Sequence, residues 1–210
     1  MGKIHIDLFT TLDLVAQAPG GPDEDPEGGF PFGGWQAPLF DDLVGAEVGA
    51  AIAGLDALLL GRKTHDIFAG YWPQAEDGVD GSIAHVFNKV PKYVASRTAP
   101  ALDWAGSRLL SPDLVAAVNE VRDRHQSIHV IGSLDLVQTL LHEKLFDRLN
   151  LWVYPIVLGT GKKVFQGGEV PTNLRLAEPP LAGSSGAVLL RYELADGVPQ
   201  TGDMGARDGD

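Results

Sequence analysis

The sequence predicts an α/β fold in which helices flank a mixed, mostly parallel sheet. From residue 41 to residue 158, short apolar segments typical of buried strands alternate with segments of helical periodicity. The last two predicted strands have no helix between them, which favours an antiparallel edge. The chain has 210 residues, of which 44% are hydrophobic, and this is enough for one substantial core.

Apolar runs indicate the strands. The first is predicted at residues 3–8 and continues toward residue 12, because Ile4, Ile6 and Leu8 alternate with polar neighbours. The remaining strands are predicted at 56–60, 92–95, 128–131, 149–158 and 188–194. Several of these are apolar throughout, as expected for strands buried on both faces.

Helical spacing and start signals indicate three helices. The first covers 41–55, with Asp41 and Asp42 at its positive N-terminal end. In the second, Ser111 is predicted as the cap and Pro112 as the first helical residue. The third begins at Ser133. The side chains expected to face the core are Leu114, Val115, Val118 and Val121 in the second helix, and Leu136, Val137, Leu140 and Leu141 in the third.

Two segments resist assignment to helix or strand. Residues 18–34 hold four prolines, six glycines and four acidic residues, a composition typical of a functional lid or a disordered insert. Residues 196–210 are rich in glycine and aspartate, so we expect a disordered acidic tail after one domain at residues 1–195.

Composition argues against several classes of function. The chain has no cysteine, which excludes disulfides and thiolate chemistry, and its six histidines lack metal-site spacing. We therefore expect no metal, and histidines 65, 85, 125, 129 and 142 are predicted at surface or polar strand positions. The net charge of -12 disfavours nucleic acid and anionic membranes as partners. No apolar segment is long enough for a membrane span and the first residues are polar, so we expect a cytoplasmic protein.

Small or cationic residues follow three of the predicted strands. The segments are Gly61-Arg62-Lys63-Thr64, Ser96-Arg97-Thr98 and His129-Val130-Ile131-Gly132-Ser133. Glycine allows close approach, cations and hydroxyls bind phosphate oxygens, and a helix N-terminus attracts an anion. Each segment alone also has an ordinary explanation: surface charges after a strand for the first, a solvated turn for the second and a strand-to-helix turn for the third. Because nucleotides bind at the strand ends of α/β sheets, the three together indicate a phosphate-bearing ligand.

The same segments resemble a known family, the reductase domain of the riboflavin pathway and its dihydrofolate-reductase-like relatives. The resemblance covers about residues 3–194. It rests on Thr11-Leu12-Asp13, on Leu60 to Thr64, on Val130-Ile131-Gly132-Ser133, and on residues 155–161 before Phe165. It implies a three-layer dihydrofolate-reductase-like fold and a reductase that uses NADPH.

The resemblance also implies roles for individual residues. Arg62, Lys63 and Thr64 would contact the cofactor phosphates, and Ser96 and Arg97 would take the 2′-phosphate that distinguishes NADPH from NADH. Residues 132–134 would lie under the pyrophosphate, with Thr11 and Leu12 close to the nicotinamide. The chain departs from the family pattern at Ser133, where many relatives have a second glycine, and at Leu14, where many have glycine.

Aromatic and acidic residues are expected on the substrate side. The aromatic candidates are Trp35, Phe40, Tyr71 and Trp72, which are able to sandwich a flat heterocycle or, alternatively, to close the core. Asp42 is the predicted proton donor, enclosed by Trp35, Phe40 and the 18–34 loop, with Asp41, Glu47 and Tyr71 as alternatives.

The leading hypothesis is therefore an NADPH-dependent reductase of a small pterin-like, pyrimidine or imine-type substrate. Two alternatives stay open at this point: a nucleotide-binding protein without turnover and a flavin-binding oxidoreductase. The family resemblance further implies a homodimer, with the apolar strand at 149–158 as a candidate edge interface.

Overall fold

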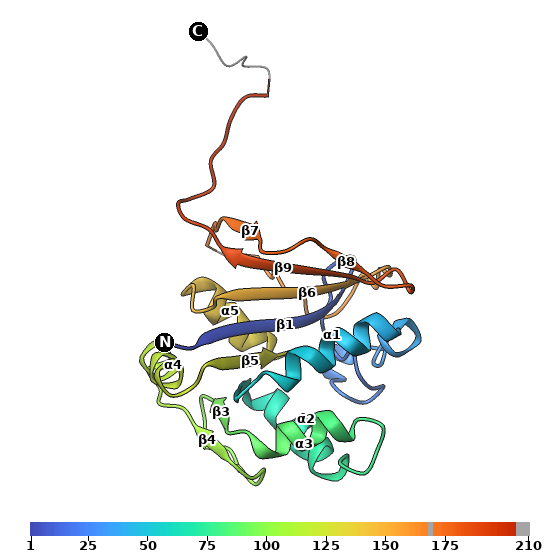
Figure 1. The fold of residues 1–210 in the computed structure, drawn as a ribbon, viewed down its shortest axis with the longest axis vertical. Helices are drawn as coiled ribbons and strands as arrows, with labels where there is room; N and C mark the ends of the chain where they lie inside the picture. Colours follow the sequence, from blue (N-terminus) through green and yellow to red (C-terminus); the bar gives the residue numbers. More distant parts are fainter. Residues whose placement is uncertain (168–169, 205–210) are drawn as a thin grey trace.

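A nine-stranded sheet forms the centre of the computed structural model, which describes residues 1–167 and 170–204 (Figure 1). The strands are β1 (Lys3–Thr11), β2 (Ala57–Gly61), β3 (Lys92–Ala95), β4 (Ser107–Leu109), β5 (Ser127–Ile131), β6 (Arg148–Tyr154), β7 (Leu174–Leu176), β8 (Leu181–Ala182) and β9 (Val188–Leu194). Their order is β4-β3-β2-β5-β1-β6-β9-β7, with β8 also paired to β9. All neighbours from β4 to β6 are parallel, and β9 is antiparallel to β6, β7 and β8. The predicted parallel centre and antiparallel edge are confirmed.

Helices cover both faces of the sheet, giving three layers (Figure 1). They are α1 (Asp42–Ala53), α2 (Arg62–Tyr71), α3 (Gly81–Lys89), α4 (Leu114–Arg124) and α5 (Leu134–His142), with short 3₁₀ turns at Glu27–Gly29, Ala37–Leu39 and Trp72–Gln74. On one face, Ile4, Ile6 and Leu8 of β1 share a core with α4 and α5. On the other face, α1 packs with the residues around Trp152, and with Leu58 and Leu60 of β2. The alternation of β1 therefore matches a strand between two cores.

Two details of the second predicted helix are wrong. Helix α4 starts at Leu114, and its cap is Asp113, whose Oδ1 accepts a hydrogen bond from the Ala116 N–H at 3.1 Å. Val115 is 40% exposed, and Ala117 takes the inward position. A carboxylate at the N-cap both satisfies a free N–H and complements the helix dipole, which explains why Asp113 replaces Ser111 as the cap.

The proposed edge interface is also wrong in its location. Strand β6, which the prediction placed at 149–158, ends at Tyr154 and lies between β1 and β9. Its backbone is hydrogen-bonded on both sides, so it has no free edge for a second chain. The edges of the sheet are formed by β4 on one side and by β7 and β8 on the other.

The predicted tail falls only partly within the structure. After β9 the chain runs away from the sheet (Figure 1). Residues 205–210 lie outside the described residues, so the tail and the domain boundary at residue 195 stay predictions. Among the helices that the structure describes, none has the length and apolar character needed to cross a membrane.

Candidate functional site

The three phosphate-competent segments line one cavity of about 1130 Å³. It lies where β2, β3 and β5 end and α2 and α5 begin, because the carboxyl ends of parallel strands meet at one edge of the sheet. The predicted residues that line it are Gly61, Arg62, Lys63, Thr64, Ser96, Arg97, Thr98, Ile131, Gly132, Ser133 and Leu134. Segments up to 73 residues apart in sequence, counted from Gly61 to Leu134, thus share one wall.

The turn from β5 into α5 has an unusual backbone. Gly132 and Ser133 both lie in the left-handed region, with φ of 66° and 59°. Glycine adopts this conformation readily, but serine does so at a cost. The Ser133 hydroxyl accepts a hydrogen bond from the Gly61 N–H at 2.8 Å, which ties the end of β2 to the start of α5. This bond holds Ser133, in its left-handed conformation, against the neighbouring strand.

The first turns of α2 and α5 present backbone N–H groups at the cavity. Gly61, the N-cap of α2, has no side chain to cap the helix, and the Ser133 hydroxyl is engaged with Gly61 instead of the first turn of α5. By contrast, Asp41 and Asp113 cap α1 and α4. Free N–H groups at helix N-termini attract anions, so both helix starts fit a phosphate-bearing ligand.

The predicted cations differ in how far their charge is already paired. Arg62 pairs with Asp66 one turn along α2 at 2.7 Å, and Lys63 pairs with Glu27. Arg97 is exposed at the end of β3, between Ser96 and Thr98. Within residues 1–167 and 170–204, its guanidinium makes no ion pair or hydrogen bond. Arg97 is therefore the cation at this cavity that is ready to accept an anion.

The 18–34 loop is anchored beside the cavity instead of being a loose insert. Phe30 and Trp35 are both 8% exposed and belong to the core beneath α1. The Phe30 ring packs over Gly161, where a Cβ atom would come within 2.7 Å of the ring. The buried Gln17 side chain donates to the backbone oxygens of Asp25 and Glu27, both at 3.0 Å.

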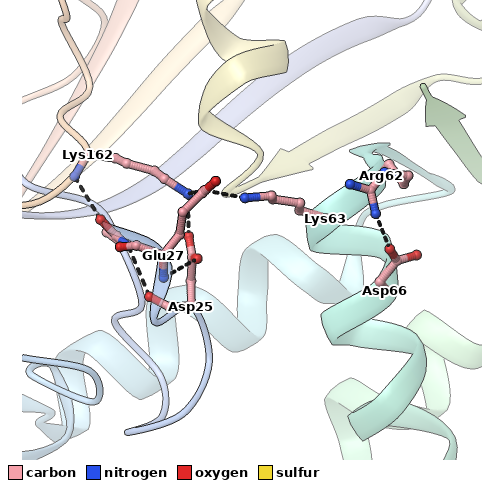
Figure 2. A network of polar contacts seen from close by, with 7 residues as sticks. Asp25, Glu27, Arg62, Lys63, Asp66 and Lys162 are labelled. Carbon is pink, nitrogen blue, oxygen red and sulfur yellow. Dashed lines mark hydrogen bonds and ion pairs between the residues drawn. The ribbon is translucent and has the colours of Figure 1, made fainter. Parts of the chain in front are cut away.

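Acidic residues of this loop bind lysines from two other segments (Figure 2). Lys162 contacts Asp25 at 2.6 Å and Glu27 at 2.5 Å, and Glu27 also contacts Lys63 of α2. Hydrogen bonds and charge from Lys162 and Lys63 lower the pKa of Glu27 to about 2. Glu27 is therefore ionised at neutral pH, and it pairs with Lys63, a residue that was predicted to bind phosphate. Asp25 itself lines the cavity.

Of the four predicted substrate-binding aromatics, only Trp72 lines the cavity. Trp35 packs edge-on against Tyr154 at 5.5 Å and donates to the Gln17 carbonyl, so it closes the core as the alternative reading proposed. Phe40 and Tyr71 are more than half exposed and lie outside the cavity wall. Trp72 is half-buried against Phe87, and its buried indole N–H has no partner among the described residues.

The expected environment of Asp42 is absent, and this prediction needs correction. Asp42 is an exposed residue in the first turn of α1 and does not line the cavity. Of its alternatives, Asp41 caps α1 and binds Ser185, whereas Glu47 lines the cavity and pairs with Arg191 at 2.5 Å. The enclosure by Trp35, Phe40 and the 18–34 loop that was predicted for Asp42 is therefore not formed.

The residues predicted near the nicotinamide, Thr11 and Leu12, are also outside the cavity wall. Thr11 is fully buried and its hydroxyl donates to Asp13 at 2.6 Å, while Leu12 is 63% exposed. Asp13 in turn accepts from the Leu158 and Gly159 N–H groups. These hydrogen bonds join the end of β1 to the loop after β6, so the Thr11-Leu12-Asp13 segment has a structural role.

Sequence reasoning missed a buried polar cluster in the same cavity. Asp7 of β1, His129 of β5 and Asn150 of β6 all line it. Asp7 accepts from His129 Nδ1 at 2.7 Å and from Asn150 Nδ2 at 2.8 Å. His129 lies at a polar strand position, as predicted, and is 5% exposed, whereas His65 lies in α2 and is 1% exposed, so it is neither a surface nor a strand residue. The available signal was an aspartate and an asparagine inside two of the predicted strands.

Comparisons with known proteins agree with this architecture. The chain is 26% identical over 196 residues to the uncharacterized protein YyaP of Bacillus subtilis, covering 90% of this chain and 94% of that protein. A Shewanella protein assigned to riboflavin biosynthesis has a TM-score of 0.65 at 18% identity, covering 92% of this chain and 99% of its own. A pyrimidine reductase-like protein from Corynebacterium diphtheriae has a TM-score of 0.59 at 13% identity, covering 93% of each chain.

A longer enzyme shares the fold as well. The deaminase/5-amino-6-(5-phosphoribosylamino)uracil reductase of Thermotoga maritima has a TM-score of 0.61 at 15% identity, and the match covers 92% of this chain and 57% of that enzyme. These likenesses confirm the predicted three-layer fold. The family of the RibD C-terminal domain matches residues 2–183. This protein therefore belongs to the family of the RibD C-terminal domain.

Proposed function

We propose that this protein is an NADPH-dependent reductase that passes a hydride to a small pyrimidine, pterin-like or imine-type substrate. The observation that carries the proposal is the single cavity lined by Gly61 to Thr64, by Ser96 to Thr98 and by Ile131 to Leu134. NADPH, when bound, supplies the hydride. The family membership and the uracil reductase activity named for the Thermotoga maritima enzyme support a reductase of nitrogen heterocycles.

The residues present fit the phosphates of a dinucleotide. Two helix starts with free N–H groups face the cavity, and Gly61 and Gly132 leave room for close approach. Arg97 has no ion-pair partner among the described residues and suits the 2′-phosphate, because guanidinium groups bind phosphate oxygens in pairs. The protein has a net charge of -12, so these local groups must provide the attraction.

Calorimetry and turnover test the proposal directly. NADPH, NADH and FMN are titrated into the protein, and oxidation of bound NADPH is then followed with pyrimidine, pterin and imine substrates. We expect NADPH to bind most tightly and to be oxidised in the presence of at least one substrate. Preferential FMN binding would support the flavin alternative, and NADPH binding without oxidation by any substrate would support a nucleotide-binding protein.

Glu27→Gln is expected to tighten NADPH binding about two- to fivefold, the scale of an exposed ion pair. The neutral amide no longer holds Lys63 and Lys162 through charge, so Lys63 becomes available to a phosphate. Because the pKa of Glu27 is about 2, the wild-type competition persists throughout the neutral range. Calorimetric titration at neutral pH measures the change.

The matched control is Glu120→Gln, which removes another exposed carboxylate that pairs with an arginine, on α4 and outside the cavity wall. Its NADPH affinity is expected to equal that of the wild type. If Glu27→Gln leaves affinity unchanged or weakens it, the loop supports the site instead of competing for its cations.

We also propose a homodimer, as the family resemblance implied, now through an edge strand. Strand β7 is short and places Leu174 and Leu176 at the surface, 36% and 42% exposed. Light scattering at micromolar concentration is expected to give twice the mass of the 22.3 kDa chain. A mass of one chain would refute the dimer.

A further inference from the structure

The polar cluster of Asp7, His129 and Asn150 lies on the face of the sheet that α1 covers. Asp7 is paired with Asn150 across β1 and β6, so their side chains lie side by side on one face. Their side chains are largely buried: Asp7 is 16% exposed, His129 6% and Asn150, as a residue, 8%. All three line the cavity that contains the phosphate-competent segments.

This cluster has hydrogen-bond acceptors to spare. Asn150 Oδ1 is buried and has no partner among the residues that the structure describes. Burial alone would raise the pKa of Asp7, but hydrogen bonds from His129 and Asn150 outweigh it and lower the pKa below its usual value. An ionised carboxylate has about four lone-pair sites, and these two bonds use only part of them. A buried acceptor without a donor is costly, so a ligand donor at this place is favoured.

Within the described residues, the charged side chains nearby do not bind the free acceptors of Asp7 and Asn150. Glu47 and Arg191, which line the same part of the cavity, pair with each other at 2.5 Å. Burial and the nearby His129 lower the pKa of His5 to about 4, so His5, stacked on His129, is neutral at neutral pH. Asp7 and Asn150 therefore present oxygen acceptors to this part of the cavity, which favours a ligand group that carries N–H donors.

The cluster also adjoins the proposed cofactor site. Asp7 is paired with Ile131 across β1 and β5, and its carbonyl oxygen accepts from the Gly132 N–H at 3.4 Å. A ligand held by Asp7 and Asn150 is therefore next to the turn at which the cofactor is expected. The phosphate-competent segments and this cluster occupy different parts of one continuous cavity wall.

We propose that Asp7 and Asn150 bind the substrate heterocycle through two neighbouring N–H groups, as in an amino-substituted pyrimidine, with His129 positioning the Asp7 carboxylate. This assignment rests on the proposed reductase function and narrows its substrate class. A ring N–H and an adjacent amino group match the carboxylate of Asp7 and the free Oδ1 of Asn150. Substrates that offer only acceptors on that edge, or that carry a carboxylate there, are excluded.

Two pyrimidines of similar shape test the recognition on the unmodified chain. The first, 2,4-diaminopyrimidine, carries amino donors and, once protonated at ring N1 beside the Asp7 carboxylate, an adjacent ring N–H. The second, 2,4-dimethoxypyrimidine, has no amino group. Calorimetry with and without saturating NADPH is expected to show at least about tenfold tighter binding of the diamino compound, as for hydrogen bonds to a charged group. Equal affinities, or binding of neither compound, would overturn the proposal.

Variants assign the effect to the cluster. Asn150→Leu and Asp7→Asn are each expected to weaken 2,4-diaminopyrimidine at least about tenfold, while the NADPH affinity stays within about twofold. Asp42→Asn is the matched control, because Asp42 is an exposed carboxylate outside the cavity wall. Thermal unfolding checks that each variant is folded, and the ligand pair on the wild-type chain still decides if one variant is not.

The experiment separates this inference from the function on which it rests. Failure of NADPH to bind, with selective diaminopyrimidine binding that depends on Asn150, would refute the cofactor and keep the recognition site. Normal NADPH binding with an unchanged diaminopyrimidine affinity in both cluster variants would keep the reductase and refute the site. In that case Asp7, His129 and Asn150 form an internal structural cluster only.

Discussion

Gly132→Val is expected to abolish measurable NADPH binding, with a loss of about 100-fold or more, the upper range for a steric clash in a packed site. A Cβ atom on Gly132 points at the Thr64 side chain, 3.8 Å away. The two branched methyl groups of valine would therefore fill the gap between the starts of α5 and α2, where the pyrophosphate is proposed to lie. Calorimetric titration with NADPH measures the loss.

The backbone effect of this substitution needs its own control. Gly132 has a φ of 66°, so valine also strains the turn, at a cost of about 1–3 kcal/mol in the free energy of unfolding. Gly159 has a φ of 74°, lies outside the cavity wall, and has no described atom within 4 Å of its Cβ position. Gly159→Val should show similar destabilisation with full NADPH affinity. Equal NADPH affinity in the two valine variants would mean that Gly132 serves only the turn.

Most of the sheet could be predicted from the sequence because its strands are apolar and its signals are local. Ala57 to Leu60 are completely buried, and a run of this kind has few alternatives to a central strand. The 62–71 helix was missed because its first residues, Arg62 and Lys63, were read as ligand-binding groups following a strand. Arg62 and Lys63 form the first turn of α2 and also line the cavity.

The phosphate-competent side of the cavity was predictable for the same reason. Its residues follow strands directly, and parallel strands bring their carboxyl ends to one edge whatever the connecting loops do. The substrate side was not predictable, since it depends on tertiary packing. Nothing in the local pattern of Trp35 indicates that it packs against Tyr154, more than 100 residues further along the chain.

Polar residues in central strands were the signal that sequence reasoning left unused. Asp7 does not interrupt the apolar face of β1. Successive residues of a strand point to opposite faces, so Asp7 lies on the face opposite Ile6 and Leu8, where a polar residue was compatible with the predicted core. Only the structure shows that this opposite face is also covered, by α1, so that Asp7 and Asn150 lie beneath a helix. Similarly, the contact between Glu27 and Lys63 joins residues 36 positions apart and has no local signature.

Arg97→Ala is expected to remove the preference for NADPH over NADH. NADPH affinity should fall about 10- to 150-fold, equivalent to the 1.5–3 kcal/mol of a hydrogen bond to a charged group, while NADH affinity changes little. The reason is that Arg97 is the cation of the cavity wall that is uncommitted within the described residues, whereas Arg62 and Lys63 are already paired. Calorimetry with both cofactors on the wild type and the variant measures the two affinities.

Salt and a control arginine complete this test. If Arg97 binds the 2′-phosphate, the wild-type preference for NADPH should shrink as salt screens the exposed charge, and the Arg97→Ala variant should show no such dependence. Arg124→Ala removes an exposed arginine of α4 that pairs with Glu120, outside the cavity wall, and should keep the full preference. A variant without Arg97 that still favours NADPH to the wild-type extent would assign the 2′-phosphate to another group. Lys63 would then be the next cation to replace, because it lines the cavity and its partner, Glu27, is an exposed glutamate.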